Sequence, residues 1–237
     1  MAKHNVWLSV SDLMTGLMII FLFIAVSYIS KNQDNESVLR EYIDAKRDLH
    51  NELEKTLSLS IRNKEVELSP DLSLRFTKAE TCFDPGSFYI KPEFKKSLDE
   101  VMSKYFDLLL RDTLKVNIKE IRIEGHTDDQ QIKENNPLYD PDKFVSNAKL
   151  SQFRALEVLK YLKNNIANKY DGKDKEFLEF WLTANGMSYS RALDKDGQLV
   201  FNTKEQIAPE KSRRVEIRLI TRGDEILENF VSKTLEK

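Results

Sequence analysis

The chain has 237 residues, of which 32% are charged, with a formal net charge of -2 and one cysteine. A charge balance this close to neutral lacks the basic surface of nucleic-acid-binding proteins, so we expect no nucleic-acid partner. A single cysteine excludes an intramolecular disulfide. Cys82 is predicted to be a small buried hydrophobic residue, and a bridge between two copies of the chain is the alternative.

Residues 6–29 form an apolar stretch in which Asp12 is the only charged side chain. A helix of this length reaches roughly 36 Å, enough to cross a hydrocarbon core of about 30 Å. We therefore expect a transmembrane helix after a short tail at residues 1–5. Trp7 and Tyr28 stand near its ends, where aromatic side chains favour the membrane interfaces. No small-x-small cleavage site follows, so the segment is expected to be retained.

Asp12 is the first candidate functional residue. A carboxylate inside a span costs about 2 to 3 kcal/mol to insert, and such groups usually face a bundle interior or a wet cavity. Thr15 lies on nearly the same helix face and is a candidate to hydrogen-bond the carboxyl or a carried ion; the alternative is a small residue at a helix contact. A second interpretation is that Asp12 caps a shorter helix beginning near Leu13.

Residues 30–65 are highly charged and contain sparse apolar side chains. These side chains are spaced mostly three, four or seven apart, which describes a narrow helical stripe. The pattern predicts a helical linker that serves as a plug or dimer stalk, or else a solvated linker with helical tendency. The stripe consists of Leu39, Tyr42, Ile43, Leu49, Leu53 and Leu57.

The remainder of the chain is predicted to form an α+β domain at residues 66–222. Strand and helix patterns alternate along it, which indicates helices on one face of a mixed sheet. Residues 223–237 are predicted to form a terminal helix or tail. The predicted strands are at 66–76, 118–124, 180–185 and 214–220, and the predicted helices are at 91–110 and 150–166.

Three motifs follow one another in this domain: EGHTD at 124–128, NAKLSQFRA at 147–155 and SRRVEI at 212–217. Together they resemble the OmpA-type peptidoglycan-binding domain over about residues 70–221, with Ser212 replacing the family's usual asparagine. The resemblance implies that Asp128 accepts from the ammonium of a diaminopimelate and that Arg154 clamps its carboxylate. It further implies a peptidoglycan-binding site that includes Thr127, Asn147, Leu150 and Ser151.

For an isolated Asp128 and Arg154, a turn cap and a solvated helix face are the alternatives. Residues 129–146 look longer than the family's loop at this position, and we expect this loop either to shape ligand preference or to close the groove. His126 is interpreted as structural. No catalytic residue, metal site or enzymatic activity is predicted, because His4 and His50 have no partner residues for catalysis in the surrounding sequence.

With such a domain downstream, the segment DLMTGLM at 12–18 resembles the signature of MotB-type stator subunits, whose aspartate carries the transported ion. The resemblance implies a single-pass protein of the bacterial inner membrane, with a cytoplasmic N-terminus and a periplasmic C-terminal domain. It also implies a homodimer within a ring of a multispan MotA-like or ZorA-like partner, at about five partner subunits to two copies of this chain. The transported ion would be H⁺ or Na⁺, and no cofactor is implied.

The short N-terminal tail and the long loop are more typical of the ZorB family of Zorya anti-phage systems than of flagellar stators. The sequence therefore favours a ZorB-like stator subunit. A flagellar or other MotB-like stator subunit is one alternative. A passive inner-membrane tether to peptidoglycan, in which Asp12 is incidental, is the other.

Overall fold

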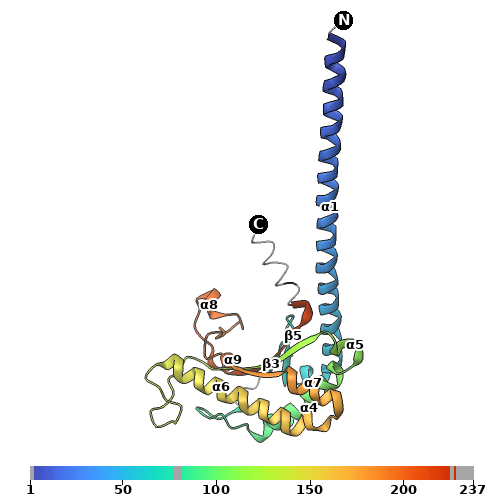
Figure 1. The fold of residues 1–237 in the computed structure, drawn as a ribbon. Coiled ribbons are helices and arrows are strands. Elements are labelled where there is room, and N and C mark those ends of the chain that lie inside the picture. The colour runs from blue at the N-terminus through green and yellow to red at the C-terminus, as the bar shows by residue number, and fades with distance from the viewer. Residues whose placement is uncertain (1–2, 77–81, 225–226, 228–237) are drawn as a thin grey trace. The chain divides into compact units, whose positions relative to one another are not determined.

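The computed structural model describes residues 3–76, 82–224 and 227, and it divides into two compact units, Met1–Asp48 and Leu49–Lys237. Most of the terminal helix or tail predicted at 223–237 lies outside the described residues. Helix α1 (Lys3–Thr56) runs through the first unit into the second (Figure 1). It contains no proline, which is consistent with its unbroken course.

The first unit contains a candidate membrane span. Within α1, Val10–Ser30 is long and apolar enough to cross a bilayer, by length and composition. Its large apolar side chains are exposed, as shown by Leu13 at 74% and Phe23 at 67%. A helix that is apolar on all sides over this length suits a lipid environment.

The last turns of α1 belong to the core of the second unit. Leu49, Leu53 and Leu57 are spaced four apart, so they share one helix face, and all three are buried in the main hydrophobic cluster. Ile43, from the same apolar stripe, is 50% exposed. The folded unit therefore begins before residue 66, the expected boundary, because the C-terminal part of the stripe, Leu49 to Leu57, packs in the hydrophobic core of this unit.

The second unit is built on a mixed sheet with strand order β1-β2-β5-β3-β4. Strand β4 runs parallel to β3, whereas the other neighbouring pairs are antiparallel. This arrangement confirms the α+β class with a mixed sheet. The strands are β1 (Val66–Leu68), β2 (Leu74–Phe76), β3 (Ile118–His126), β4 (Leu182–Gly186) and β5 (Arg214–Thr221).

Helices α4, α6 and α7 lie on one face of this sheet (Figure 1). Alternation along the strands explains the two faces: Ile123 and Ile217 point into the hydrophobic core, whereas their neighbours Glu124 and Glu216 point away from it. The helices after α1 are α2 (Ser58–Arg62), α4 (Pro92–Leu109), α5 (Asp112–Lys115), α6 (Lys143–Tyr161), η1 (Leu162–Ile166, a π turn), η2 (Ala167–Lys169), α7 (Gly172–Trp181), α8 (Val200–Thr203) and α9 (Pro209–Ser212).

Three element boundaries differ from the expectation. Residues 66–76 form two short strands rather than one, since Leu72 turns the chain with φ of 67°. The helix expected at 150 begins at Lys143, because the Asp142 side chain accepts from the amides of the first helical turn. The strand expected at 180 begins at Leu182, because α7 continues to Trp181.

Cys82 is 2% exposed and lies in the main hydrophobic cluster, as the sequence indicated. Burial raises the pKa of its thiol to about 12, while the charge of Arg154 acts in the opposite direction. A bridge to a second copy of the chain would require this part of the core to open, because a disulfide joins Cβ atoms only about 4 Å apart.

Candidate functional site

A pocket of about 400 Å³ lies where the chain leaves β3 and enters α6. The sequence predicted six residues for a binding site in this region, and the structure brings five of them to the pocket wall. Ser151 is the exception. The lining consists of Pro85, Gly86, Thr127, Asp128, Gln130, Gln131, Ile132, Lys133, Asn135, Asn136, Pro137, Asn147, Leu150, Arg154 and Arg213.

Asp128 lines the pocket, and one oxygen of its carboxylate has no hydrogen bond among the described residues. The residue is 5% exposed, and its Oδ1 accepts from the Gln130 amide at 3.4 Å, which closes a local turn. Its Oδ2 has no hydrogen-bond partner among the described residues and lies 3.6 Å from Nε of Arg213. A buried carboxylate oxygen without a hydrogen bond is costly, so this atom is poised to accept from a ligand. The local turn thus uses one oxygen of the carboxylate and leaves the other without a hydrogen bond among the described residues.

Arg154 is buried rather than on a solvated helix face. Its Nε donates to the Ser87 carbonyl at 2.9 Å and its Nη2 to the Asp84 carbonyl at 3.2 Å. Its guanidinium also stands 4.9 Å from the centre of the Phe83 ring. Burial lowers the pKa of Arg154 to about 10, and the charge of Asp128 opposes this shift. Among the described residues no hydrogen bond uses Nη1, so this part of the fork can face a ligand.

Arg213 belongs to the pocket, although in the sequence it stands out only as part of the SRRVEI motif. It follows directly after α9, and its Nε donates to the Pro209 carbonyl at 3.2 Å. Its side chain is 37% exposed, at the rim beside Asp128. The signal was the pair of adjacent arginines at the start of a predicted strand. Arg214 is the first residue of β5 and joins the buried charge network, whereas Arg213 lies between α9 and this strand and lines the pocket.

The loop before α6 forms one wall of the pocket. Asn136 donates to the Gly86 carbonyl at 2.9 Å, which joins this loop to the turn on the other side. Asn147 donates to the Gln130 carbonyl at 2.9 Å and holds the start of the loop. Leu150 packs with Ile132 and Leu138 of the loop. These anchors hold the loop beside the pocket, and its effect on ligand preference or groove closure stays a prediction.

Two serines of the motifs serve as structural links. Ser151 Oγ accepts from the Ser188 amide at 2.9 Å and donates to the Ala148 carbonyl at 3.0 Å, which fixes α6 to the turn after β4. Ser212 Oγ accepts from the Leu193 amide at 2.9 Å and donates to its carbonyl at 3.1 Å. Serine thus supplies polar contacts at the position where asparagine is usual in the OmpA family.

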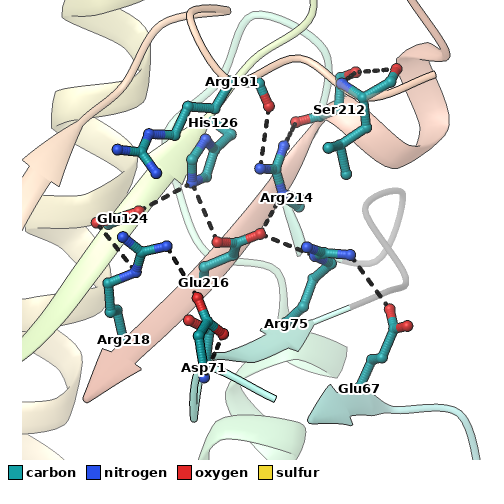
Figure 2. Close-up of polar contacts among 12 residues, drawn as sticks. Glu67, Asp71, Arg75, Glu124, His126, Arg191, Ser212, Arg214, Glu216 and Arg218 are labelled. Carbon is teal, nitrogen blue, oxygen red and sulfur yellow. Dashed lines mark hydrogen bonds and ion pairs between the residues drawn. The ribbon is translucent and has the colours of Figure 1, made fainter. Parts of the chain in front are cut away.

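The face of the sheet away from the helices carries a buried charge network (Figure 2). Glu216 Oε1 accepts from Nε of Arg214 at 2.7 Å and from Nε of Arg75 at 2.9 Å. His126 Nε2 lies 3.6 Å from Glu124 Oε2 and 3.9 Å from Glu216 Oε2. Burial lowers the pKa of His126, which favours the neutral imidazole. This placement agrees with a structural role for His126.

Two carboxylates and one imidazole of this network, from Glu124, Glu216 and His126, resemble the ligands of a metal centre. Potential ligand atoms of Glu124, His126 and Glu216 lie within 4.8 Å of one another. However, Arg214 and Arg75 already compensate the charge of Glu216, so a divalent cation would face two guanidinium groups. We therefore interpret the cluster as part of the sheet's charge network.

The other predicted site is in α1. Asp12 lies well inside this helix, which begins at Lys3, so the alternative of Asp12 as its N-cap does not apply. The Thr15 hydroxyl donates to the Ser11 carbonyl at 2.8 Å and is thus satisfied within the helix. The roles predicted for Asp12 and Thr15 in ion transport depend on a surrounding ring and stay predictions.

Comparison with known proteins adds independent information. The OmpA family matches residues 82–199. The chain is 31% identical to the Zorya protein ZorB of Escherichia coli over 228 residues, which cover 92% of this chain and 88% of that protein. Among solved structures, the cell wall anchor of the T6SS from Pseudomonas aeruginosa shares 21% identity over 71% of this chain and 96% of its own, with a TM-score of 0.45. The periplasmic domain of Helicobacter pylori MotB shares 16% identity over 72% of this chain and 97% of its own, with a TM-score of 0.44.

Proposed function

The chain belongs to the family of the Zorya protein ZorB and carries an OmpA-family domain, and from this premise we propose that it is the peptidoglycan-anchored stator subunit of an ion-driven membrane motor in anti-phage defence. One observation carries the proposal. A single chain combines a lone acidic residue, Asp12, in an apolar span with a pocket in which one carboxylate oxygen of Asp128, beside two arginines, has no hydrogen bond among the described residues.

The pocket has the chemistry to bind the zwitterionic end of a peptidoglycan stem peptide. Oδ2 of Asp128 can accept from the ammonium group. The unused Nη1 of Arg154 can donate to the carboxylate, and a charge-assisted hydrogen bond in a desolvated pocket is stronger than one in water. Because backbone carbonyls already hold the Arg154 guanidinium, little side-chain entropy is lost on binding.

The membrane helix has the chemistry for ion coupling. Two copies of the chain place two Asp12 carboxyls within a ring of a MotA-like or ZorA-like multispan partner. An ion that crosses the membrane potential supplies about 2.3 kcal/mol per charge per 100 mV. This energy is similar to the cost of placing a carboxylate in the span, so a loading and release step can drive rotation of the ring. H⁺ and Na⁺ both suit this step.

The membrane site and the peptidoglycan site have complementary roles: one drives the ring and the other holds the stator. The N-terminus lies in the cytoplasm and the chain crosses the inner membrane once, so the OmpA-family domain is in the periplasm, where peptidoglycan is. Anchoring keeps the two copies of this chain still while the ring turns. Without the anchor, stator and ring would turn against each other and deliver no work to the cell.

A paired experiment tests the proposal by separating the two sites. We expect Asp12→Asn to abolish protection against phage while the full chain still co-sediments with isolated sacculi. Asp128→Asn should instead act on the peptidoglycan site first, so that the chain co-sediments with sacculi much more weakly. The matched control is Asp44→Asn, because Asp44 is on the same helix, is 58% exposed and forms a surface ion pair with Arg47; both readouts should stay at the wild-type level. Full protection by the Asp12→Asn chain would leave only a passive tether.

A further inference from the structure

The charges that line the pocket do not cancel. Asp128 is the single acidic side chain among the lining residues, whereas Lys133, Arg154 and Arg213 are cationic. A ligand with one ammonium and one carboxylate would pair with Asp128 and Arg154 and would leave the other two cations without a counter-charge. The pocket is therefore electrostatically suited to a ligand that carries more than one anionic group.

Arg213 is the better placed of the two remaining cations. Its Nε is held by the Pro209 carbonyl and lies 3.6 Å from Oδ2 of Asp128. Among the described residues, no hydrogen bond uses its Nη1 or Nη2, so these donors are available at the rim. Lys133, in contrast, is exposed on the loop, where a flexible ammonium group stays hydrated.

Ligand binding changes the surroundings of Arg213. In the structure, Asp128 is the acidic partner of Arg213. When a ligand ammonium takes Oδ2 of Asp128, the negative charge near Arg213 is neutralised. A second carboxylate on the ligand would replace it, and the planar guanidinium matches a carboxylate with two parallel donors.

We propose, on the basis of the function given above, that Arg213 forms a second anion subsite and that the pocket selects stem peptides with free carboxyl groups over stem peptides in which a carboxyl is amidated. The first carboxylate contacts Arg154 inside the pocket. The second contacts Arg213 at the rim. Amidation removes the charge and one acceptor from the second group and leaves the Arg213 donors without their partner.

The test uses the full chain in detergent micelles and two soluble, fluorescently labelled stem peptides. One has free carboxyl groups, and the other is amidated only at the second carboxyl, the group assigned to Arg213. Fluorescence anisotropy gives the dissociation constant of each. We expect the wild type to bind the free form about 10-fold more tightly, as for loss of one charge-assisted contact. Arg213→Gln should bind both forms as weakly as the wild type binds the amidated form. Arg213→Lys should keep part of the preference.

The control is Arg111→Gln, which removes an exposed arginine 4.0 Å from Glu52 and should keep the full preference. Equal binding of both peptides by the wild type, or a preference that survives in Arg213→Gln, would overturn the subsite. Equal binding by the wild type would overturn the subsite even if the Arg213→Gln chain folds poorly. The proposed function fails in a different way, namely if Asp128→Asn binds both peptides as tightly as the wild type does.

Discussion

Glu216 shows how single residues set the stability of the sheet. Burial alone would raise its pKa, but the guanidinium of Arg214, together with His126 and Arg75, lowers the pKa to about 2. Burial also lowers the pKa of His126. In both residues, protonation is therefore easier in the unfolded chain than in the folded one.

These two shifts predict a loss of stability in acid. The unfolded chain takes up a proton at His126 below about pH 6.5 and at Glu216 below about pH 4.3, whereas the folded chain resists both until lower pH. The free energy of unfolding should therefore fall as the pH drops from about 6.5 towards 2. Urea titrations at several pH values measure it. A free energy of unfolding that is independent of pH across this range would contradict the assignment.

Glu216→Gln tests at neutral pH how much the Glu216 charge contributes to the free energy of unfolding. The substitution leaves the Arg214 side chain, 4% exposed, without its acidic partner, so we expect a loss of about 3 to 5 kcal/mol. Glu67→Gln is the matched control, since Glu67 is 60% exposed and contacts the same Arg75 at 3.5 Å. Its cost should stay below about 1 kcal/mol.

Some of the site residues could be predicted from the sequence, and others could not for a physical reason. Asp128 and Arg154 stand in recognisable motifs, so their presence in a pocket could be predicted. The Asp84 and Ser87 carbonyls that hold Arg154 come from a turn about 70 residues earlier, and only the tertiary fold brings them together. Arg213 was missed because its direction depends on the short helix α9 before it.

At the scale of elements, two glycines decide how closely α6 approaches the sheet. A Cβ at Gly125 would meet the backbone of Ser151, and a Cβ at Gly186 would lie 2.6 Å from Cα of Gln152. Side-chain atoms are not tolerated at such distances, so these strand ends require glycine. The close approach sets the position of α6, and hence of Arg154, which this helix carries.

Gly186→Ala should therefore displace α6 from the sheet. We expect a loss of about 1 to 3 kcal/mol in stability, as for other overpacked sites, and weaker co-sedimentation with sacculi. Gly16→Ala is the control for both readouts, because nothing lies within 4 Å of a Cβ at that position. Unchanged stability and binding in Gly186→Ala would show that α6 tolerates the extra atom.

Elements with strong periodicity could be predicted, and short or locally capped ones could not. The repeated apolar spacing in α4 and the alternation in β3 and β5 gave the right elements. Strands β1 and β2 have three residues each, too few for alternation to reveal a hairpin. The start of α6 was missed because a single Asp142 side chain sets it.

At the scale of the whole molecule, the division of the chain differs from the one that composition indicated. Charged residues dominate 30–65, which resembles a linker, yet Leu49, Leu53 and Leu57 from this region complete the domain core. A few buried leucines at wide spacing leave average composition nearly unchanged. Their burial depends on contacts with helices and strands much later in the chain, which composition does not reveal.

This division predicts different fates for two truncated chains. Residues 45–237 should fold, because they retain the three leucines. Residues 66–237 should be much less stable, since burying one leucine side chain contributes about 1.5 to 3 kcal/mol. Thermal unfolding followed by circular dichroism, with sacculus co-sedimentation, compares the two. If the shorter chain melted at the same temperature, the last turns of α1 would be dispensable to the domain.

The buried position of Cys82 has a practical consequence for work on the intact assembly. It is the sole native thiol, and its high pKa keeps it from forming the thiolate that attacks maleimides or oxidants. Reporter cysteines can thus be introduced one at a time without first mutating the background. Oxidative crosslinking in living bacteria would then map which helix positions of two subunits face each other.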